Sequence, residues 1–568
     1  MGEATRAGVT VTGNPARVLR AGCRFGWPVA LLPLAWLDPD HRQVGLLLSW
    51  LAAQALYLLQ WPRPRGLIRW RAPLALRLAL VAYAAALLVI FCLVYDNWRW
   101  AATADSLNFY EIGAEMVRGN PDINPLGARG IFEQCTVVQA TLQNAFMYLS
   151  PSLFAHRLGN LLTSALLVLA ASAFAGQTSG ATAGLLMALF LPLNSVFAVF
   201  TLISYPNLSG VLPYYAAYAL FVAAWSVWES DFLWAALGLA CGLAAYFLPL
   251  WLAAVAAVSA GVVLSALYWR RPRILLIWAG GALVALTPAL LQFETFIRVL
   301  FVFRPMSGLT LDYVARMTWQ ALLLPFWSEM KSYGAGGGWL APPFNYLWLA
   351  GVVLALTSAG LTVLRRPRAR VLRYAWVWLP LFCADALGLA MANSGYSTVS
   401  LKRAIVMLPN MTFLMVLPLA WLAERIQRTG ATAVLILCAL AGYAYVNTAT
   451  LAAAQFGYTV ADGVIRMQQT VPGRVLLISP HEDIRRKFAA NGDEDDLVQR
   501  IFQVRERAVV SAAVPQQRAD FDRAACFSRH LDGQEWGDRV QAALAGLCPN
   551  APVEPITAEL ECVRCDPR

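Results

Sequence analysis

The chain has 568 residues, of which 59% are hydrophobic and only 14% are charged, and its formal net charge is +11. Soluble globular domains carry roughly 25% charged residues, so this composition excludes a soluble protein and indicates one that spans a membrane several times. The spans must be helices, because an open strand leaves backbone polar groups without partners in lipid. Most arginines lie in short segments between apolar stretches, as the positive-inside rule predicts, so the positive charge does not indicate nucleic-acid binding.

Apolar stretches long enough to cross a bilayer recur along most of the chain. In chain order, the expected spans are residues 25–37, 44–61, 74–95, 153–175, 181–200, 211–228, 232–248, 250–269, 274–291, 344–364, 374–392, 404–423 and 431–450. The fold class expected is therefore an all-α polytopic membrane protein of about 13 helices. The arginine-rich loops all fall on one side, which places the N-terminus in the cytoplasm and the C-terminal tail outside. Lysine is scarce while arginine and alanine abound, which indicates a bacterial source and hence the inner (cytoplasmic) membrane.

Two long external loops interrupt the expected membrane module, which covers residues 1–454. They are residues 96–151 and 292–343. The segment after Asp105 in the first loop is expected to form an amphipathic helix, suited to the membrane interface. Its polar stripe consists of Asn108, Glu111, Glu115 and Arg118. Its apolar stripe consists of Leu107, Tyr110, Ala114 and Val117. Asp105 stands at the start of this helix, off the polar stripe, either as an N-cap or as a catalytic carboxylate at the outer membrane surface.

Two further positions place cations at the outer side of the membrane. A short external loop over residues 393–403 contains Tyr396, Lys402 and Arg403, although such loops normally avoid basic residues. Arg157, next to His156, begins the span that follows the first long loop. Each cation has two interpretations, because a long basic side chain can reach lipid headgroups or can bind the phosphate of a lipid-linked substrate.

Weaker candidates for substrate contact lie in the remaining external segments. Tyr205 and Asn207 place an aromatic ring and an amide outside, although tyrosine is also common at membrane interfaces without any ligand. Lys331 lies in the second long loop, where most charges are expected to form a solvated face. That loop also contains an expected interfacial helix over 311–324, capped by Thr310.

The polar tail, residues 455–568, is long enough to form a small α/β domain outside the cytoplasm. A buried strand is expected over 475–478, a helix over 493–507 and a second strand over 509–514. A single Cys-X-X-Cys pair is a weak zinc signal, and cysteines outside the cytoplasm favour disulfides. The sequence leaves their pairing open among Cys526, Cys548, Cys562 and Cys565.

The topology and the Asp105 segment together resemble the GT-C glycosyltransferases that use polyprenyl-phosphate-linked sugars, in particular the aminoarabinose transferase and protein O-mannosyltransferase group. Asp105, with Tyr110, Ala114 and Gly119 following, is similar to the acidic start of that family's first external loop. Six spans then lead to a second long loop, and a soluble domain ends the chain. Many members carry Asp-Glu or Asp-X-Asp at this point, whereas this chain has Asp105-Ser106. No metal and no other cofactor is therefore predicted.

The resemblance implies a transfer with inversion from a polyprenyl-phosphate-linked donor to a glycan, lipid or protein acceptor outside the cytoplasm. Asp105 would act as the general base on the acceptor hydroxyl. Lys402, Arg403 and Arg157 would bind the donor phosphate, and Glu111 would contact the sugar.

Two other classes stay open. A lipid-linked oligosaccharide polymerase or ligase uses the same lipid substrate at the same side of the membrane. A transporter or flippase would place ionisable residues at the middle of the membrane, whereas here the charges fall mainly at span ends. Asp385 and Arg77 are the main candidates for exceptions, and the sequence places both near an end.

Overall fold

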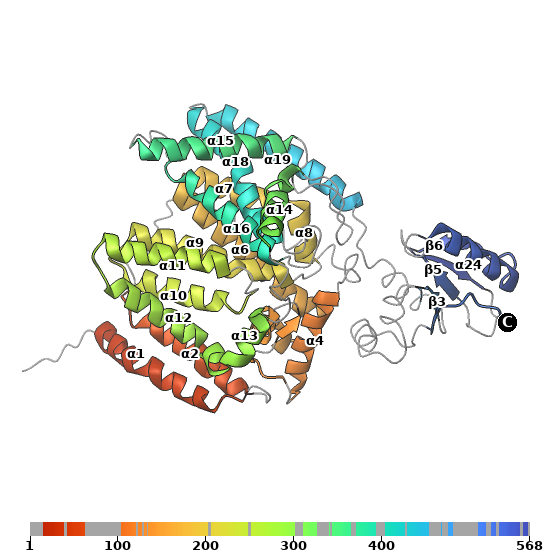
Figure 1. Cartoon of the computed structure of the whole chain (residues 1–568), viewed down its shortest axis with the longest axis horizontal. Helices are drawn as coiled ribbons and strands as arrows, with labels where there is room; N and C mark the ends of the chain where they lie inside the picture. The colour runs from red at the N-terminus through yellow and green to blue at the C-terminus, as the bar shows by residue number, and fades with distance from the viewer. Residues whose placement is uncertain are drawn as a thin grey trace, which may run out of the picture. The chain divides into compact units, whose positions relative to one another are not determined.

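The computed structural model describes residues 15–38, 43–62, 104–120, 123–127, 130–132, 135–150, 152–202, 206–247, 252–301, 310–326, 340, 343–364, 371–392, 404–426, 429–453, 467, 475–480, 509–517, 524–529, 533–556 and 560–565. These residues form many helices and a small sheet near the C-terminus (Figure 1). The expected fold class, an all-helical membrane protein with a small α/β tail, is confirmed.

Among the described residues, five helices are long and apolar enough to cross a membrane, and a bent pair makes a sixth. The five are Phe154–Ser179, Leu208–Ser226, Arg273–Leu291, Phe344–Val363 and Ile405–Arg425. Shorter apolar helices occupy Val44–Leu59, Asp231–Ala244, Ala254–Tyr268, Ala375–Ala390 and Ala433–Asn447. The count of 13 spans stays a prediction, and the expected span over 74–95 lies outside the described residues.

The expected span over 181–200 is not a single straight helix. It consists of α7 (Ala181–Phe190) and α8 (Ser195–Leu202), which meet at an angle of 60°. Pro192 lies in the break, and a proline removes a helical hydrogen bond and clashes with the preceding turn. Asn194 then starts α8, because its Oδ1 accepts hydrogen bonds from the backbone N–H groups of Val196 (3.0 Å) and Phe197 (3.3 Å).

The helices divide into two compact units. The first comprises Met1–Arg71, Gly119–Gln139 and Pro213–Pro305. Its elements are α1 (Pro15–Leu31), η1 (Leu32–Trp36), α2 (Val44–Leu59), β1 (Gly130–Phe132), β2 (Cys135–Thr136), α10 (Asp231–Ala244), α11 (Leu252–Tyr268), α12 (Arg273–Leu291) and α13 (Phe293–Phe301), together with most of α9 (Pro206–Ser226). The first expected span, 25–37, falls on the end of α1 and on η1, which are not among the helices that are long and apolar enough to cross a membrane.

Small residues let the helices of the first unit approach closely. A Cβ atom at Gly238 of α10 would lie 2.1 Å from the carbonyl oxygen of Trp278 in α12, so only glycine fits there. Trp50 of α2 donates its indole N–H to the backbone oxygen of Ala285 at 3.1 Å, and the Tyr57 hydroxyl donates to that of Ile277 at 2.6 Å. These bonds join α2 to α12 and satisfy polar side-chain atoms that are buried in an apolar interior.

The second unit comprises Ala72–Arg118, Ala140–Leu212 and Met306–Arg568. Its helical elements are α4 (Ala104–Arg118), η2 (Ala145–Tyr148), α6 (Leu153–Ser179), α7, α8, α14 (Leu311–Leu322), η5 (Leu324–Phe326), α15 (Phe344–Val363), η6 (Ala375–Val377), α16 (Trp378–Ala392), η7 (Ile405–Met407), α18 (Leu408–Arg425), α19 (Thr429–Ala453) and α24 (Gln534–Leu547). The short helix α5 (Val137–Gln143) runs across the division. Buried aromatic contacts hold this unit together, such as the stacked rings of Trp378 and Phe413 with centroids 4.0 Å apart.

The tail forms a five-stranded sheet in the order β4-β3-β5-β7-β6. The strands are β3 (Val475–Ile478), β4 (Val509–Ser511), β5 (Ala524–Phe527), β6 (Val553–Pro555) and β7 (Glu561–Arg564). β3 pairs in parallel with β4 and β5, and β7 pairs antiparallel with β5 and β6. The strand expected over 475–478 is confirmed, the second expected strand is shorter than 509–514, and the helix expected over 493–507 lies outside the described residues. Helix α24 lies beside the sheet (Figure 1), where its Val540 and Leu544 join the buried core.

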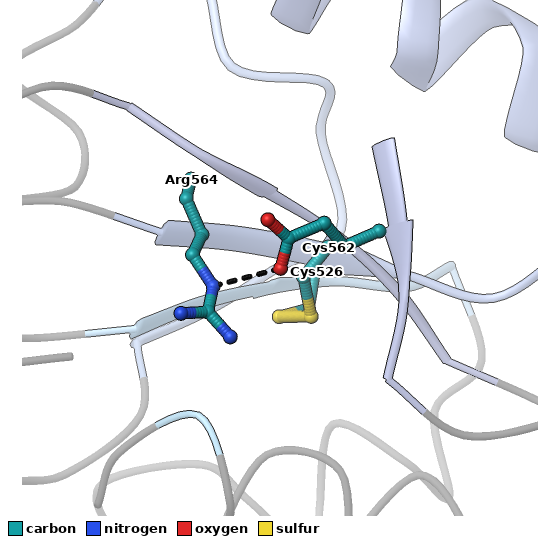
Figure 2. The surroundings of a disulfide bond; sticks show 4 residues. Cys526, Cys562 and Arg564 are labelled. Carbon is teal, nitrogen blue, oxygen red and sulfur yellow. Dashed lines mark ion pairs between the residues drawn. A yellow bond between two sulfur atoms is a disulfide. The ribbon is translucent and has the colours of Figure 1, made fainter. Parts of the chain in front are cut away.

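Two disulfides cross-link the tail, and they give the cysteine pairing that the sequence left open. Cys526 of β5 pairs with Cys562 of β7, and Cys548 pairs with Cys565. Figure 2 shows the first of these beside Arg564, which forms an ion pair with Glu554 at 2.9 Å. Cys562 and Cys565, the Cys-X-X-Cys pair that gave a weak zinc signal in the sequence, are both in disulfides.

Candidate functional site

Helix α4 presents one buried face and one exposed face, which confirms the expected amphipathic helix. Phe109, Ala114 and Met116 are buried, whereas Glu115 and Arg118 form an ion pair at 2.5 Å on the other side. The buried face packs against η2 and α6 of the same unit. This face is therefore covered by protein, and the location of the helix at the membrane interface stays a prediction.

Asp105 occupies the second position of α4, since the helix begins at Ala104. Residues four apart lie on one helical face, and Phe109 and Gly113 therefore continue the stripe that starts at Asp105. A Cβ atom at Gly113 would lie 2.5 Å from Cγ of Asn144, so this stripe meets Asn144 closely. The side chain of Asp105 lies outside the described atoms.

Asn144 links α4 to α6 through two buried hydrogen bonds. Its Nδ2 donates to the backbone oxygen of Phe109 at 2.7 Å, and its Oδ1 lies 2.6 Å from Nδ1 of His156. Asn144 itself is fully buried. Because buried amide and imidazole groups are costly to leave unpaired, this pair of bonds fixes how α4 sits against α6.

His156 and Arg157 are the fourth and fifth residues of α6, after the N-cap residue Ser152. Each of the two side chains is only 1% exposed. The ring of Tyr110 contacts His156 edge-on, with centroids 5.9 Å apart. Burial excludes the interpretation in which Arg157 reaches out to lipid headgroups. The structure therefore places Tyr110, one of the residues expected from the sequence, against His156, the residue that precedes Arg157 in α6.

Gly159 holds α6 against the segment that carries Asn144. A Cβ atom at Gly159 would lie 2.0 Å from the backbone oxygen of Gln143, so no other residue fits without a shift of the backbone. The side chain of Gln143 accepts a hydrogen bond from the Ser209 hydroxyl at 3.0 Å, which adds the start of α9 to the cluster. We call this set of contacting residues from α4, α5, η2, α6 and α9 the α4–α6 cluster.

The other expected site residues are placed only in part. Glu111 and Asn207 lie in α4 and α9, and their side chains are outside the described atoms. Five more lie outside the described residues: Tyr205, Lys331, Tyr396, Lys402 and Arg403. The phosphate clamp at the last two therefore stays a prediction. The helix expected over 311–324 is confirmed as α14, capped by a hydrogen bond of 3.1 Å from the Tyr313 N–H to the Thr310 hydroxyl.

Asp385 does not lie at a span end, which corrects the expectation from the sequence. It is the eighth of the 15 residues of α16 and it is buried. Asn410 of α18 donates its Nδ2 to the Asp385 carboxylate. An ionisable residue at the middle of an apolar helix is a functional candidate in its own right. Arg77, the other expected exception, is outside the described residues.

Asn144 and Gln143 are part of the cluster and were not singled out in the sequence. Their signal in the sequence was weak, since both are polar residues shortly before an expected span, and the structure shows that both are buried. Within the part of the chain that the structure describes, no three His, Cys, Asp or Glu side chains gather in an arrangement that would hold a metal ion.

No family model matches the chain, and no curated protein sequence matches it. Among solved structures, it is similar to ArnT from Cupriavidus metallidurans bound to undecaprenyl phosphate, with 13% identity and a TM-score of 0.42 over 85% of this chain and 99% of that one. It is also similar to the Archaeoglobus fulgidus oligosaccharyltransferase in the apo form, with 12% identity and a TM-score of 0.39 over 79% of this chain and 70% of that one. These neighbours are of the class that the sequence resembles, the GT-C glycosyltransferases.

Proposed function

We propose that the chain is a membrane glycosyltransferase that moves a sugar from a polyprenyl-phosphate-linked donor to an acceptor outside the cytoplasm, with inversion. One observation carries the proposal. Phe109, which follows Asp105 by four residues in α4, is linked through Asn144 to the buried His156, the neighbour of the buried Arg157 in α6. These contacts support a site in which Asp105 would take a proton and Arg157 would stabilise the released phosphate.

The proposed reaction uses Asp105 as the base. The Asp105 carboxylate takes the proton of the acceptor hydroxyl, and the acceptor oxygen forms a bond to the anomeric carbon. The bond between that carbon and the phosphate oxygen breaks, and the electron pair leaves with polyprenyl phosphate. A general base in this position typically contributes about 10²- to 10⁴-fold in rate.

Arg157 is proposed to stabilise the phosphate that leaves. Its burial places the guanidinium where water screens charge poorly, so its attraction for a phosphate is stronger than at the surface. Lys402 and Arg403 are proposed to share this role, and Tyr110 to line the sugar site beside His156. The proposed location is the bacterial inner membrane with the tail outside, which is supported by the two tail disulfides, since disulfides persist mainly in oxidising compartments.

A direct test is donor turnover by the purified full chain in lipid nanodiscs. The protein is given polyprenyl-phosphate-linked glucose, mannose or arabinose, labelled in the sugar, with a cell-envelope extract as the source of acceptors. We expect one donor to be consumed, with release of polyprenyl phosphate and with inverted anomeric configuration in the product. Turnover with retained configuration would contradict the displacement mechanism, and no turnover of any donor would contradict the proposed function.

A transporter is the second candidate, and Asp385 is the observation that favours it. Intramembrane carboxylates mark ion and proton pathways in many transporters. The buried hydrogen bond between Asp385 and Asn410 equally suits a structural link between α16 and α18. Substitution of Asp385 separates the two roles, as described below.

A further inference from the structure

The protonation of His156 follows from the hydrogen bonds of Asn144. The backbone oxygen of Phe109 can only accept a hydrogen bond, so the group of Asn144 that faces it must be the NH₂ group. The other end of the same amide is an oxygen, which can only accept, and it lies 2.6 Å from Nδ1 of His156. Nδ1 therefore carries the hydrogen, and in the neutral ring Nε2 is left as an acceptor.

Nε2 of His156 has no hydrogen-bond partner among the described residues, although it is fully buried. Asn160 repeats this feature one turn further along α6. Its Nδ2 donates to the backbone oxygens of Phe200 (3.2 Å) and Thr201 (3.0 Å), so its buried Oδ1 is an acceptor that meets no partner in the described part of the chain. Residues four apart share one face of a helix, so both acceptors belong to the same side of α6.

Two buried acceptors select the chemistry of the group that they bind. A phosphate monoester or diester at neutral pH offers mainly acceptor oxygens, so it does not suit this face. A sugar hydroxyl group offers a hydrogen and suits it well. The neighbouring Arg157 carries only donors and suits the phosphate. At the start of α6, His156 is therefore suited to bind the sugar, and its neighbour Arg157 is suited to bind the phosphate.

We propose that Nε2 of His156 accepts a hydrogen bond from a hydroxyl group of the donor sugar, which makes His156 a residue that determines sugar recognition. The position of His156 agrees with the proposed role of Asp105 as the base. Asn144 holds His156 at the level of Phe109, and Phe109 follows Asp105 by four residues, an axial rise of about 6 Å. The inference rests on the proposed function and adds to it the group that recognises the sugar.

Two substitutions separate this role from a structural one. In His156→Asn, the amide NH₂ falls where Nδ1 was and keeps the bond to Asn144, while the acceptor at Nε2 is lost. In His156→Gln, the longer side chain can return an oxygen to the place of Nε2. A purely structural histidine would tolerate asparagine at least as well as glutamine. A residue that recognises the sugar shows the reverse order.

The experiment measures binding of two lipids to the purified full chain in nanodiscs, for wild type and both variants. One lipid is the polyprenyl-phosphate-linked sugar that the wild type binds best among glucose, mannose and arabinose, and the other is polyprenyl phosphate alone. We expect His156→Asn to weaken binding of the sugar-bearing lipid about tenfold, the size of one hydrogen bond, and to leave polyprenyl phosphate within about twofold. We expect His156→Gln to recover part of the loss.

Equal effects of His156→Asn on both lipids, or no effect on either, would overturn the inference and leave the proposed function in place. The latter result would mean that a bound water satisfies Nε2. If the wild type binds none of the lipids, the proposed function fails and the inference fails with it. Thermal unfolding of each variant is measured alongside binding. If a variant unfolds, the wild-type protein is tested instead with a donor lipid whose sugar lacks one hydroxyl group. The affinity for that lipid should be lower by the same tenfold.

Discussion

Replacing Gly159 with alanine should lower turnover about 100-fold without unfolding the protein. The new Cβ atom would start 2.0 Å from the backbone oxygen of Gln143, and such contacts are essentially never shorter than 3.0 Å. The contact atom is backbone, so the segments must separate by about 1 Å. Overpacking of this kind costs about 1–3 kcal/mol, and the better helix propensity of alanine offsets about 1 kcal/mol. A shift of about 1 Å between groups that position a substrate can cost about 100-fold in rate.

The assay is sugar transfer by the purified variant, with thermal unfolding measured in the same detergent. Gly360→Ala is the matched control, because Gly360 lies in the apolar helix α15 and a Cβ atom there meets nothing within 4 Å. The control should keep wild-type turnover. A Gly159→Ala enzyme with turnover within about threefold of wild type and unchanged unfolding would refute the argument that α6 must lie this close to the α4 side of the cluster.

Three further substitutions test other parts of the structure. Asn144→Ala leaves two buried groups unpaired, so the free energy of unfolding should fall by about 2–6 kcal/mol, measured by chemical denaturation; a smaller loss would mean that the two bonds are not made. Replacing both Cys526 and Cys562 with serine should destabilise the tail by about 2–5 kcal/mol, seen as faster proteolysis of the full chain, whereas unchanged proteolysis would argue against this pairing. Asp385→Asn removes the charge at nearly constant size, so sugar transfer should stay within about twofold; abolished transfer in a folded variant would instead favour an ion-coupled role.

Much of the helical framework was predictable because lipid imposes one simple rule. A span needs about 20 consecutive apolar residues, and the expected ranges 274–291 and 344–364 match α12 and α15 to within one residue. The same rule fails where an apolar run is interrupted locally. The break between α7 and α8 follows from Pro192 and Asn194, which hydrophobicity alone does not register.

Only some residues of the candidate site were marked as candidates by the sequence. Asp105 and Arg157 were marked by charge at the edges of apolar segments, which is a local signal. The bonds from Asn144 to Phe109 and to His156 are set by how helices pack, and no periodicity of the sequence reports them. Asp385 was named from the sequence as a candidate exception among the charges at span ends, but its hydrogen bond to Asn410 depends on how α16 packs against α18.

The most direct test of the central claim is the rate of sugar transfer by Asp105→Asn, measured in nanodiscs alongside binding of the donor lipid. Asparagine keeps the size of the side chain and removes its ability to take a proton. The account predicts that donor binding stays within a few-fold of wild type while turnover falls by about 10²- to 10⁴-fold. Full transfer activity in a folded Asp105→Asn protein would contradict the assignment of Asp105 as the base.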